Sequence, residues 1–187
     1  GIPSNSGVVF MPGSGNEETK LWMNLWAQTN NAFLIEWDTD KLSQLQSRYT
    51  KDKLNPQFIS SYLWKGDESF SRELIESLKG IDVSILSLDT ETSLTHGLLQ
   101  DLAWVIGNIS VKNDLFFMLN IVQRWSHRTA KQLLQQEEIV DEHIINSALE
   151  ILPNRLLQIS ERHDIQIWKT KVGSYLWGSG TPMHYVF

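Results

Sequence analysis

Residues 8–16 read VVFMPGSGN, an apolar run followed at once by a glycine-rich segment. The run is typical of a buried strand, and the segment after it is typical of a tight loop. A helix is predicted next, because Asn16 is a suitable helix cap and residues 21–26 carry apolar side chains at helical spacing. A second apolar run at residues 32–35 completes a unit of strand, helix and strand.

Leu42, Leu45 and Tyr49 indicate a short helix, and after a break at Asn55-Pro56 the helical spacing resumes at residues 58–63. The alternation of strands and helices continues through the middle of the chain. Helical spacing over residues 67–78 ends before Gly80, and residues 83–88 form another apolar, partly β-branched run. A helix capped by Thr90 or Thr92 follows, and then a strand at residues 115–122. The alternation predicts an α/β fold with layers, in which helices cover both faces of a mainly parallel sheet of about five strands.

We expect a single domain over residues 1–187, with a flexible lead-in at residues 1–6. After a mostly helical stretch, residues 165–168 alternate in polarity as a late strand does. The last segment, residues 172–187, mixes aromatic side chains with glycine, serine and proline. This mixture predicts an ordered loop that packs as a tail on the body of the domain.

Composition excludes several kinds of partner. The chain has 22 acidic and 16 basic residues, a formal net charge of −6, and no basic block, so we expect no nucleic-acid partner. No apolar run approaches the roughly 20 residues of a membrane helix, so we expect no membrane insertion. The absence of cysteine excludes disulfides and thiol chemistry. A soluble intracellular protein is expected, with a partner protein or a small-molecule ligand that the sequence does not identify.

Ligands of open α/β sheets bind beyond the carboxyl ends of the strands, which in this chain are followed by residues 12–16, 37–40, 89–93 and 122–127. Two of these segments suggest a ligand site. The first is the loop after the first strand, whose free backbone N–H groups at a helix start suit an anion. The second is the exit of the second strand at Asp38. We therefore predict a ligand site made of Gly13, Ser14, Gly15, Asn16 and Asp38.

Candidate catalytic side chains follow the strand at residues 83–88. Asp89 stands where many α/β enzymes place a nucleophile, Ser93 lies one turn further, and His184 lies in the tail, from which it can reach back. The five histidines show no spacing that suits a metal site, and no phosphate-binding lysine motif is present. The sequence therefore predicts neither a metal ion nor a cofactor.

The order of these parts resembles the α/β-hydrolase fold, and in particular a hydrolase family of transmembrane-and-coiled-coil proteins. The resemblance is carried by Leu34 to Asp38 with the leucines at 42 and 45, by Val83 to Asp89, and by Ser179 to Tyr185. It implies an oxyanion loop at Val8 to Gly15. The nucleophile elbow of such enzymes needs a small residue where this chain has Glu91, which favours a domain without a working triad.

A second resemblance is to nucleoside deoxyribosyltransferase-like proteins. In that family a glycine is followed four residues later by a glutamate on the helix after a strand, and this chain has Gly97 and Asp101 at that spacing. The resemblance implies a nucleophilic role for Asp101.

Three hypotheses on function follow. The first is a hydrolase-like domain without catalytic activity that binds a protein or ligand at the strand ends. The second is an active, esterase-like hydrolase that uses Asp89 or Ser93 with His184. The third is a deoxyribosyltransferase-like enzyme that uses Asp101.

Overall fold

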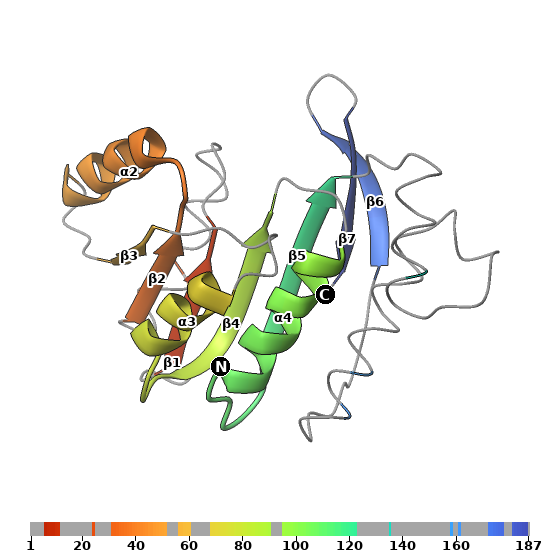
Figure 1. Cartoon of the computed structure of the whole chain (residues 1–187). Helices are drawn as coiled ribbons and strands as arrows, with labels where there is room; N and C mark the ends of the chain where they lie inside the picture. Colours follow the sequence, from red (N-terminus) through yellow and green to blue (C-terminus); the bar gives the residue numbers. More distant parts are fainter. Residues whose placement is uncertain are drawn as a thin grey trace. The chain divides into compact units, whose positions relative to one another are not determined.

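The computed structural model describes the chain at residues 6–11, 31–51, 56–60, 68–90, 95–122, 172–177 and 181–186, and at residues 24, 135, 158 and 161. Figure 1 shows the helices and strands, coloured along the sequence. Two compact units are distinguished within the chain. The first consists of Gly1–Tyr62, Ser69–Asp89 and Asn108–Phe117, and the second consists of Leu63–Glu68, Thr90–Gly107 and Met118–Phe187. The prediction of one domain over residues 1–187 stays a prediction.

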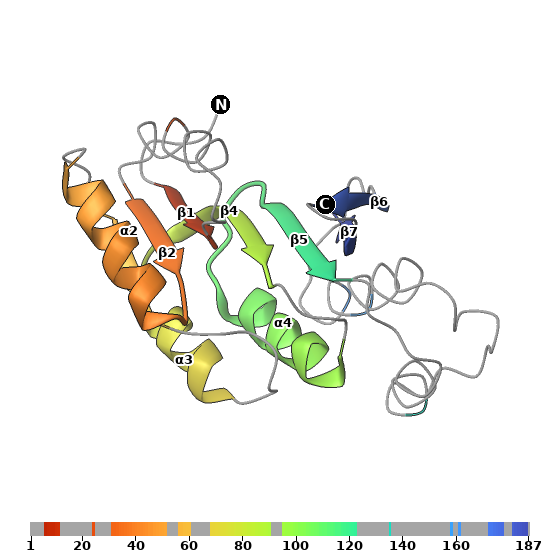
Figure 2. The same cartoon turned by 90° about the horizontal axis from the view of Figure 1, so that it is seen from above.

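The first unit is built on four parallel strands in the order β3-β2-β1-β4. These strands are β1 (Ser6–Phe10), β2 (Asn31–Ile35), β3 (Gln57–Ile59) and β4 (Asp82–Asp89). Figure 2 shows β2, β1 and β4 side by side in that order. All five residues of β1 are buried, and because side chains alternate along a strand, both faces of the sheet are covered there.

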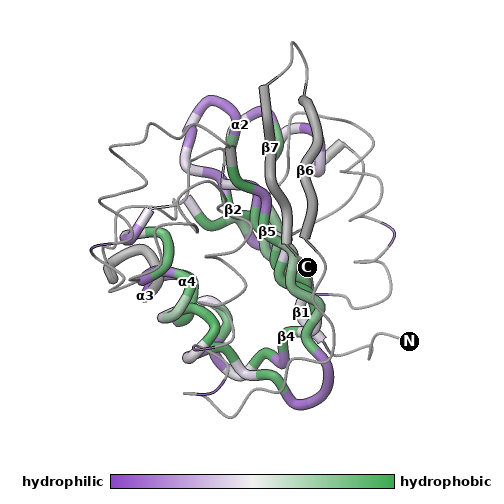
Figure 3. Tube along the Cα trace, turned by 90° about the vertical axis from the view of Figure 1, so that its right-hand side faces the viewer, coloured by the Kyte–Doolittle hydropathy of each residue, from purple (hydrophilic) through white to green (hydrophobic). Residues whose placement is uncertain are grey.

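Hydrophobic residues concentrate along these strands (Figure 3). The apolar runs predicted as the first three strands correspond to β1, β2 and β4, so these predictions are confirmed. The short β3 was not predicted, because helical spacing was expected to resume after Pro56. Only three residues pair there, with Ile35 opposite Ile59, and so short a strand leaves little period-two signal.

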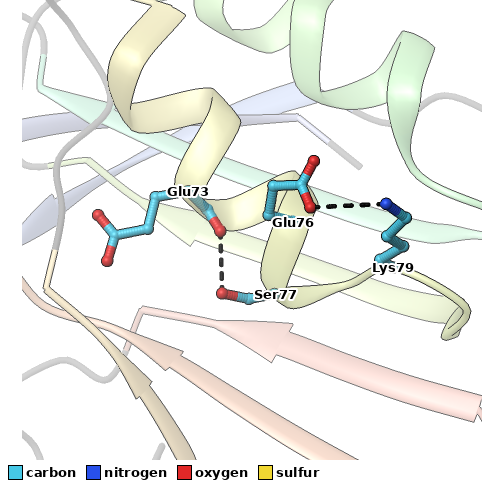
Figure 4. A network of polar contacts seen from close by, with 4 residues as sticks. All are labelled: Glu73, Glu76, Ser77 and Lys79. Carbon is cyan, nitrogen blue, oxygen red and sulfur yellow. Dashed lines mark hydrogen bonds and ion pairs between the residues drawn. The ribbon is translucent and has the colours of Figure 1, made fainter.

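Two helices of the first unit were expected. They are α2 (Thr39–Lys51) and α3 (Glu68–Ser77). Gly80 follows α3 with a φ of 79°, a left-handed conformation that glycine adopts without strain. On the surface of α3, the hydroxyl of Ser77 donates a hydrogen bond to the carbonyl oxygen of Glu73, and Lys79 forms an ion pair with Glu76 at 3.8 Å (Figure 4).

The second unit contains most of α4 (His96–Asn108), the end of β5 (Phe116–Val122), and the strands β6 (Val172–Trp177) and β7 (Thr181–Val186). Thr95 caps α4, since its hydroxyl accepts a hydrogen bond from the N–H of Leu98 at 3.1 Å. The helix therefore starts later than the predicted caps at Thr90 or Thr92.

The tail is a pair of strands, so the prediction of an ordered loop at residues 172–187 was wrong. β7 pairs antiparallel with β5 on one side and with β6 on the other. Trp177 pairs with Thr181, so the small residues 178–180 fall between the two strands. Pro182, which suggested a loop, is the second residue of β7, close to a strand start where proline is tolerated.

The seven strands follow the order β3-β2-β1-β4-β5-β7-β6. β1 to β5 are the parallel part, and the predicted α/β fold with a layered, mainly parallel sheet of about five strands is confirmed. The predicted helix after Asn16, the mostly helical stretch after residue 130 and the late strand at residues 165–168 fall outside the described residues, apart from single helical positions.

Candidate functional site

The C-terminal ends of β2, β1 and β4 lie together at one edge of the sheet in the first unit. These strands are neighbours and run parallel, with Phe10 opposite both Leu34 and Ser87. The direction in which strands are added to the sheet also reverses here. β2 and β3 lie on one side of β1, and the next strand, β4, lies on its other side. In open α/β sheets a ligand binds at such a reversal.

Met11 extends β1 by one residue at this edge. Its N–H donates a hydrogen bond to the carbonyl oxygen of Ser87 at 3.0 Å, and its side chain is almost fully buried. The loop with the predicted ligand-binding residues Gly13, Ser14, Gly15 and Asn16 starts two residues later and lies outside the part of the chain that the structure describes. Its role stays a prediction.

Glu36 and Trp37 follow β2 at the same edge. The N–H of Glu36 donates to the carbonyl oxygen of Ile59 at 3.1 Å, which prolongs the pairing with β3. Its carboxylate oxygen Oε1 accepts a hydrogen bond from the N–H of Asp38 at 2.9 Å and is thereby oriented. Trp37 is 52% exposed. A partly exposed carboxylate at position 36 and an exposed indole at position 37 therefore follow this strand in sequence.

Asp38 is the N-cap of α2. Its Oδ1 accepts hydrogen bonds from the N–H groups of Asp40 and Lys41 at 2.9 and 3.1 Å, and its carbonyl oxygen accepts from the N–H of Leu42. These are the first amide groups of the helix, which have no partner within it. The structure thus gives Asp38 a structural task, and its predicted role in ligand binding stays a prediction.

Asp89 is the last residue of β4 and is half-buried. The next residue, Thr90, is anchored to β5: its N–H and its hydroxyl both donate to the carbonyl oxygen of Asn120, at 3.2 and 3.1 Å. Asp89 is thus followed directly by a residue that is bonded to β5, and one of its own carboxylate oxygens, Oδ1, is buried. The prediction that Asp89 belongs to a functional site is consistent with this position and stays a prediction.

The other predicted catalytic residues are not assembled with Asp89 in the described part. Ser93 lies outside the described residues, as does the side chain of His184. The backbone of His184 lies within β7, paired with Ile121 of β5 and Ser174 of β6, and not in the loop that the sequence predicted.

Asp101 is buried in α4, with 3% of its surface exposed. It lies on the helix face that also carries Leu98, Leu102 and Val105, all fully buried. A nucleophile for a nucleoside substrate needs to be reached by that substrate, so this position does not suit the role that the second resemblance implied.

The described residues were considered as metal ligands and as membrane-spanning helices, and neither use is supported. No group of three or more histidine, aspartate or glutamate side chains in the described ranges is placed to hold a metal ion. Among the helices that the structure describes, none has the length and apolar character needed to cross a membrane.

Comparisons with known proteins give similarity of fold alone. No family model and no curated protein matches the sequence. An rRNA methylase from Streptococcus thermophilus matches 98% of this chain and 86% of its own, with a TM-score of 0.53 and 12% identity. Spermidine synthase from Thermotoga maritima matches 98% of this chain and 53% of its own, with a TM-score of 0.51 and 11% identity. TYW2 from M. jannaschii, in complex with AdoMet, matches 98% of this chain and 68% of its own, with a TM-score of 0.47 and 12% identity.

These findings overturn the resemblance to α/β-hydrolases. The chain shares its fold with the methylase over almost its whole length. A nucleophile elbow has the helix start directly after the strand, whereas here Thr90 is bonded to Asn120 of β5 and α4 begins at His96. The hypotheses of an active hydrolase and of an inactive, hydrolase-like binding domain were both wrong.

The resemblance to nucleoside deoxyribosyltransferase-like proteins was wrong as well. It relied on the spacing of Gly97 and Asp101 alone, and two such residues can stand four positions apart on a helix by chance. The comparisons point to the methylase fold instead, and the carboxylate at 101 is enclosed within the protein.

Glu36 and Trp37 were not singled out as site residues from the sequence. The signal that identifies Glu36 is its distance from the glycine-rich loop: an acidic residue at the exit of the second strand, about 20 residues after the glycines, is typical of nucleoside-binding α/β units. The sequence contains Gly15 and Glu36 at this spacing.

Proposed function

We propose that this chain is a methyltransferase domain that binds S-adenosylmethionine at the C-terminal edge of β2, β1 and β4. The observation that carries the proposal is the position of Glu36, an oriented and partly exposed carboxylate at the end of β2, beside the reversal of strand order. The fold shared with an rRNA methylase supports methyl transfer as the reaction class.

The residues at this edge fit the nucleoside part of such a cofactor. A carboxylate in the position of Glu36 accepts hydrogen bonds from ribose hydroxyls in related α/β folds. A carboxylate has capacity for several donors, so the bond from the N–H of Asp38 leaves room for a ribose hydroxyl. The indole of Trp37 offers an exposed apolar surface for the flat base next to it.

The loop at residues 12–16 suits the opposite end of the cofactor. S-adenosylmethionine carries an α-carboxylate, and backbone N–H groups at the start of a helix bind anions. The predicted residues Gly13, Ser14, Gly15 and Asn16 are thus proposed to bind this carboxylate. When bound, S-adenosylmethionine supplies a methyl group on a positively charged sulfur, and the task of the protein is to hold and orient it. The sequence alone called for no cofactor, and its inclusion is part of this proposal.

The test is isothermal titration calorimetry with S-adenosylmethionine on the wild-type chain and on Glu36→Gln. The substitution keeps an oxygen that accepts from the N–H of Asp38, so the local backbone is preserved. It removes a charged acceptor, and hydrogen bonds to charged groups contribute about 1.5 to 3 kcal/mol, so the affinity falls about 10- to 100-fold.

The matched control is Glu76→Gln. Glu76 lies on α3, its side chain is 67% exposed, and it pairs only loosely with Lys79. The affinity of this variant equals that of the wild type. A wild-type chain that binds no S-adenosylmethionine, or two variants that bind equally well, would overturn the proposal.

A further inference from the structure

Asp89 and Glu36 lie at the same edge of the sheet, separated by one strand. The strands lie in the order β2-β1-β4. Glu36 directly follows β2, Met11 directly follows β1, and Asp89 is the last residue of β4, so Met11 lies between the other two. Neighbouring strands are about 4.8 Å apart, so the two strand ends are on the order of 10 Å apart. All of these residues belong to the first unit.

The order of the strand ends limits where the parts of S-adenosylmethionine would lie. If Glu36 held the ribose and Trp37 lay beside the base, the rest of the molecule would extend across the end of β1 toward β4. The sulfur, which is attached close to the ribose, would then lie on the β4 side of the site. A half-buried carboxylate, Asp89, stands at that end.

We infer that the Asp89 carboxylate makes this site select the positively charged sulfonium ligand over its uncharged thioether product. The inference rests on the proposed function. S-adenosylmethionine and S-adenosylhomocysteine share the nucleoside and the amino-acid part, and they differ in one methyl group and one positive charge. A negative charge at the β4 end favours the first, which lets the product leave after each transfer.

The surroundings of Asp89 suit a charge that acts through its position. Asp89 is the last residue of β4 and is half-buried, and its neighbour in the strand, Leu88, is fully buried. Asp38, the other aspartate at this edge, uses its carboxylate to cap α2. In a partly buried setting a charge is less screened than in water, which increases its effect on a neighbouring charged ligand.

The experiment compares the affinities of the two ligands by calorimetry. The wild-type chain binds S-adenosylmethionine roughly tenfold more tightly than S-adenosylhomocysteine, as expected for one charge pair near a protein surface. Asparagine has almost the same shape as aspartate. In Asp89→Asn the two ligands bind with about equal affinity, because the affinity for S-adenosylmethionine drops and that for S-adenosylhomocysteine does not. Unchanged binding of S-adenosylhomocysteine shows at the same time that the variant is folded.

The matched control is Asp114→Asn, with the same substitution and the same change of net charge. Asp114 is exposed and lies four residues after Ser110. The carbonyl oxygen of Ser110 accepts a hydrogen bond from the N–H of Val83 near the start of β4, so this segment lies at the edge of the sheet opposite to Asp89. Its variant keeps the wild-type preference. If Asp114→Asn loses the preference as well, the effect comes from net charge and the inference is wrong.

Other outcomes separate this inference from the proposed function. A wild type that binds neither ligand refutes both. Binding that is weakened by Glu36→Gln, together with a preference that survives in Asp89→Asn, refutes the role of Asp89 and leaves the proposed function standing. An equal loss of both ligands in Asp89→Asn makes Asp89 a structural residue and refutes the inference too.

Discussion

Gly7 shows how closely β1 is packed at the level of a single atom. A Cβ atom added at this position would lie 2.6 Å from Cγ2 of Ile81, far inside the usual contact distance. Cγ2 is attached directly to the branched Cβ of isoleucine, which has little freedom to turn away. Only a residue without a side chain therefore fits beside Ile81 at the position where the register of β1 on β4 shifts.

We predict that Gly7→Ala lowers the free energy of unfolding by about 1 to 3 kcal/mol, the usual effect of overpacking a core. The measurement is urea denaturation followed by circular dichroism. The double variant with Ile81→Ala is the control, because it removes the clashing methyl group, so the two substitutions together cost less than the sum of each alone. Strict additivity would show that the contact is not the cause.

At the same scale, the sequence predicted some site residues and missed others for a clear reason. Asp89 was found because it follows an apolar run directly, and Asp38 because it lies at the polar exit of another apolar run, and both positions mark the end of a strand. Glu36 was missed because its distance from Gly15 was not considered, and that spacing has meaning only in a nucleoside-binding unit, whose strand order local patterns do not show. His184 was expected in a loop because glycine and proline surround it, yet it lies within β7.

At the scale of elements, the structure gives α2 a defined start. Asp38 accepts hydrogen bonds from two of the first amide groups of the helix, which would otherwise have no partner. The helix has a mostly polar surface and buries little beyond Leu45 and Tyr49, so the cap is a substantial part of what keeps its first turn formed.

We predict that Asp38→Ala lowers the free energy of unfolding by about 1 kcal/mol, the typical effect of losing an N-cap. Asp38→Asn retains most of the stability, because asparagine also accepts these hydrogen bonds and is an equally good cap. Both values are obtained by urea denaturation. If asparagine destabilises the chain as much as alanine does, the effect comes from the charge of Asp38 and the cap is not responsible.

Elements with strong local signals were predicted, and those that depend on distant partners were not. β1, β2, β4 and β5 are apolar runs bounded by polar or glycine residues, and α2, α3 and α4 have an apolar stripe. The hairpin of β6 and β7 was missed, because glycine at 173 and proline at 182 disfavour strands locally. Pairing of β7 with strands on both sides overrides that preference.

At the scale of the whole molecule, the charge of the chain bears on which acceptor the proposed methyl transfer would use. The fold is shared with an rRNA methylase, but the identity of 12% shows the fold alone. RNA binding relies on basic side chains that displace counterions from the phosphates. This chain has 22 acidic and 16 basic residues, and Glu36, Asp38 and Asp89 all stand at the proposed binding edge. Under the proposed function, carboxylates at this edge disfavour a polyanionic acceptor and favour a neutral or positively charged one.

We therefore predict that the chain does not bind RNA. In fluorescence anisotropy with a labelled ribosomal RNA hairpin, saturation is absent below about 100 μM protein at physiological salt, since even non-specific binders reach dissociation constants of roughly 1 to 100 μM. The same titration with S-adenosylmethionine present tests whether the cofactor creates an RNA site. Binding that strengthens steeply as salt is lowered would contradict the prediction, because that dependence requires a basic contact surface. In that case the positive charge must come from a local cluster that outweighs the acidic strand ends, and the acceptor would have to be sought among nucleic acids.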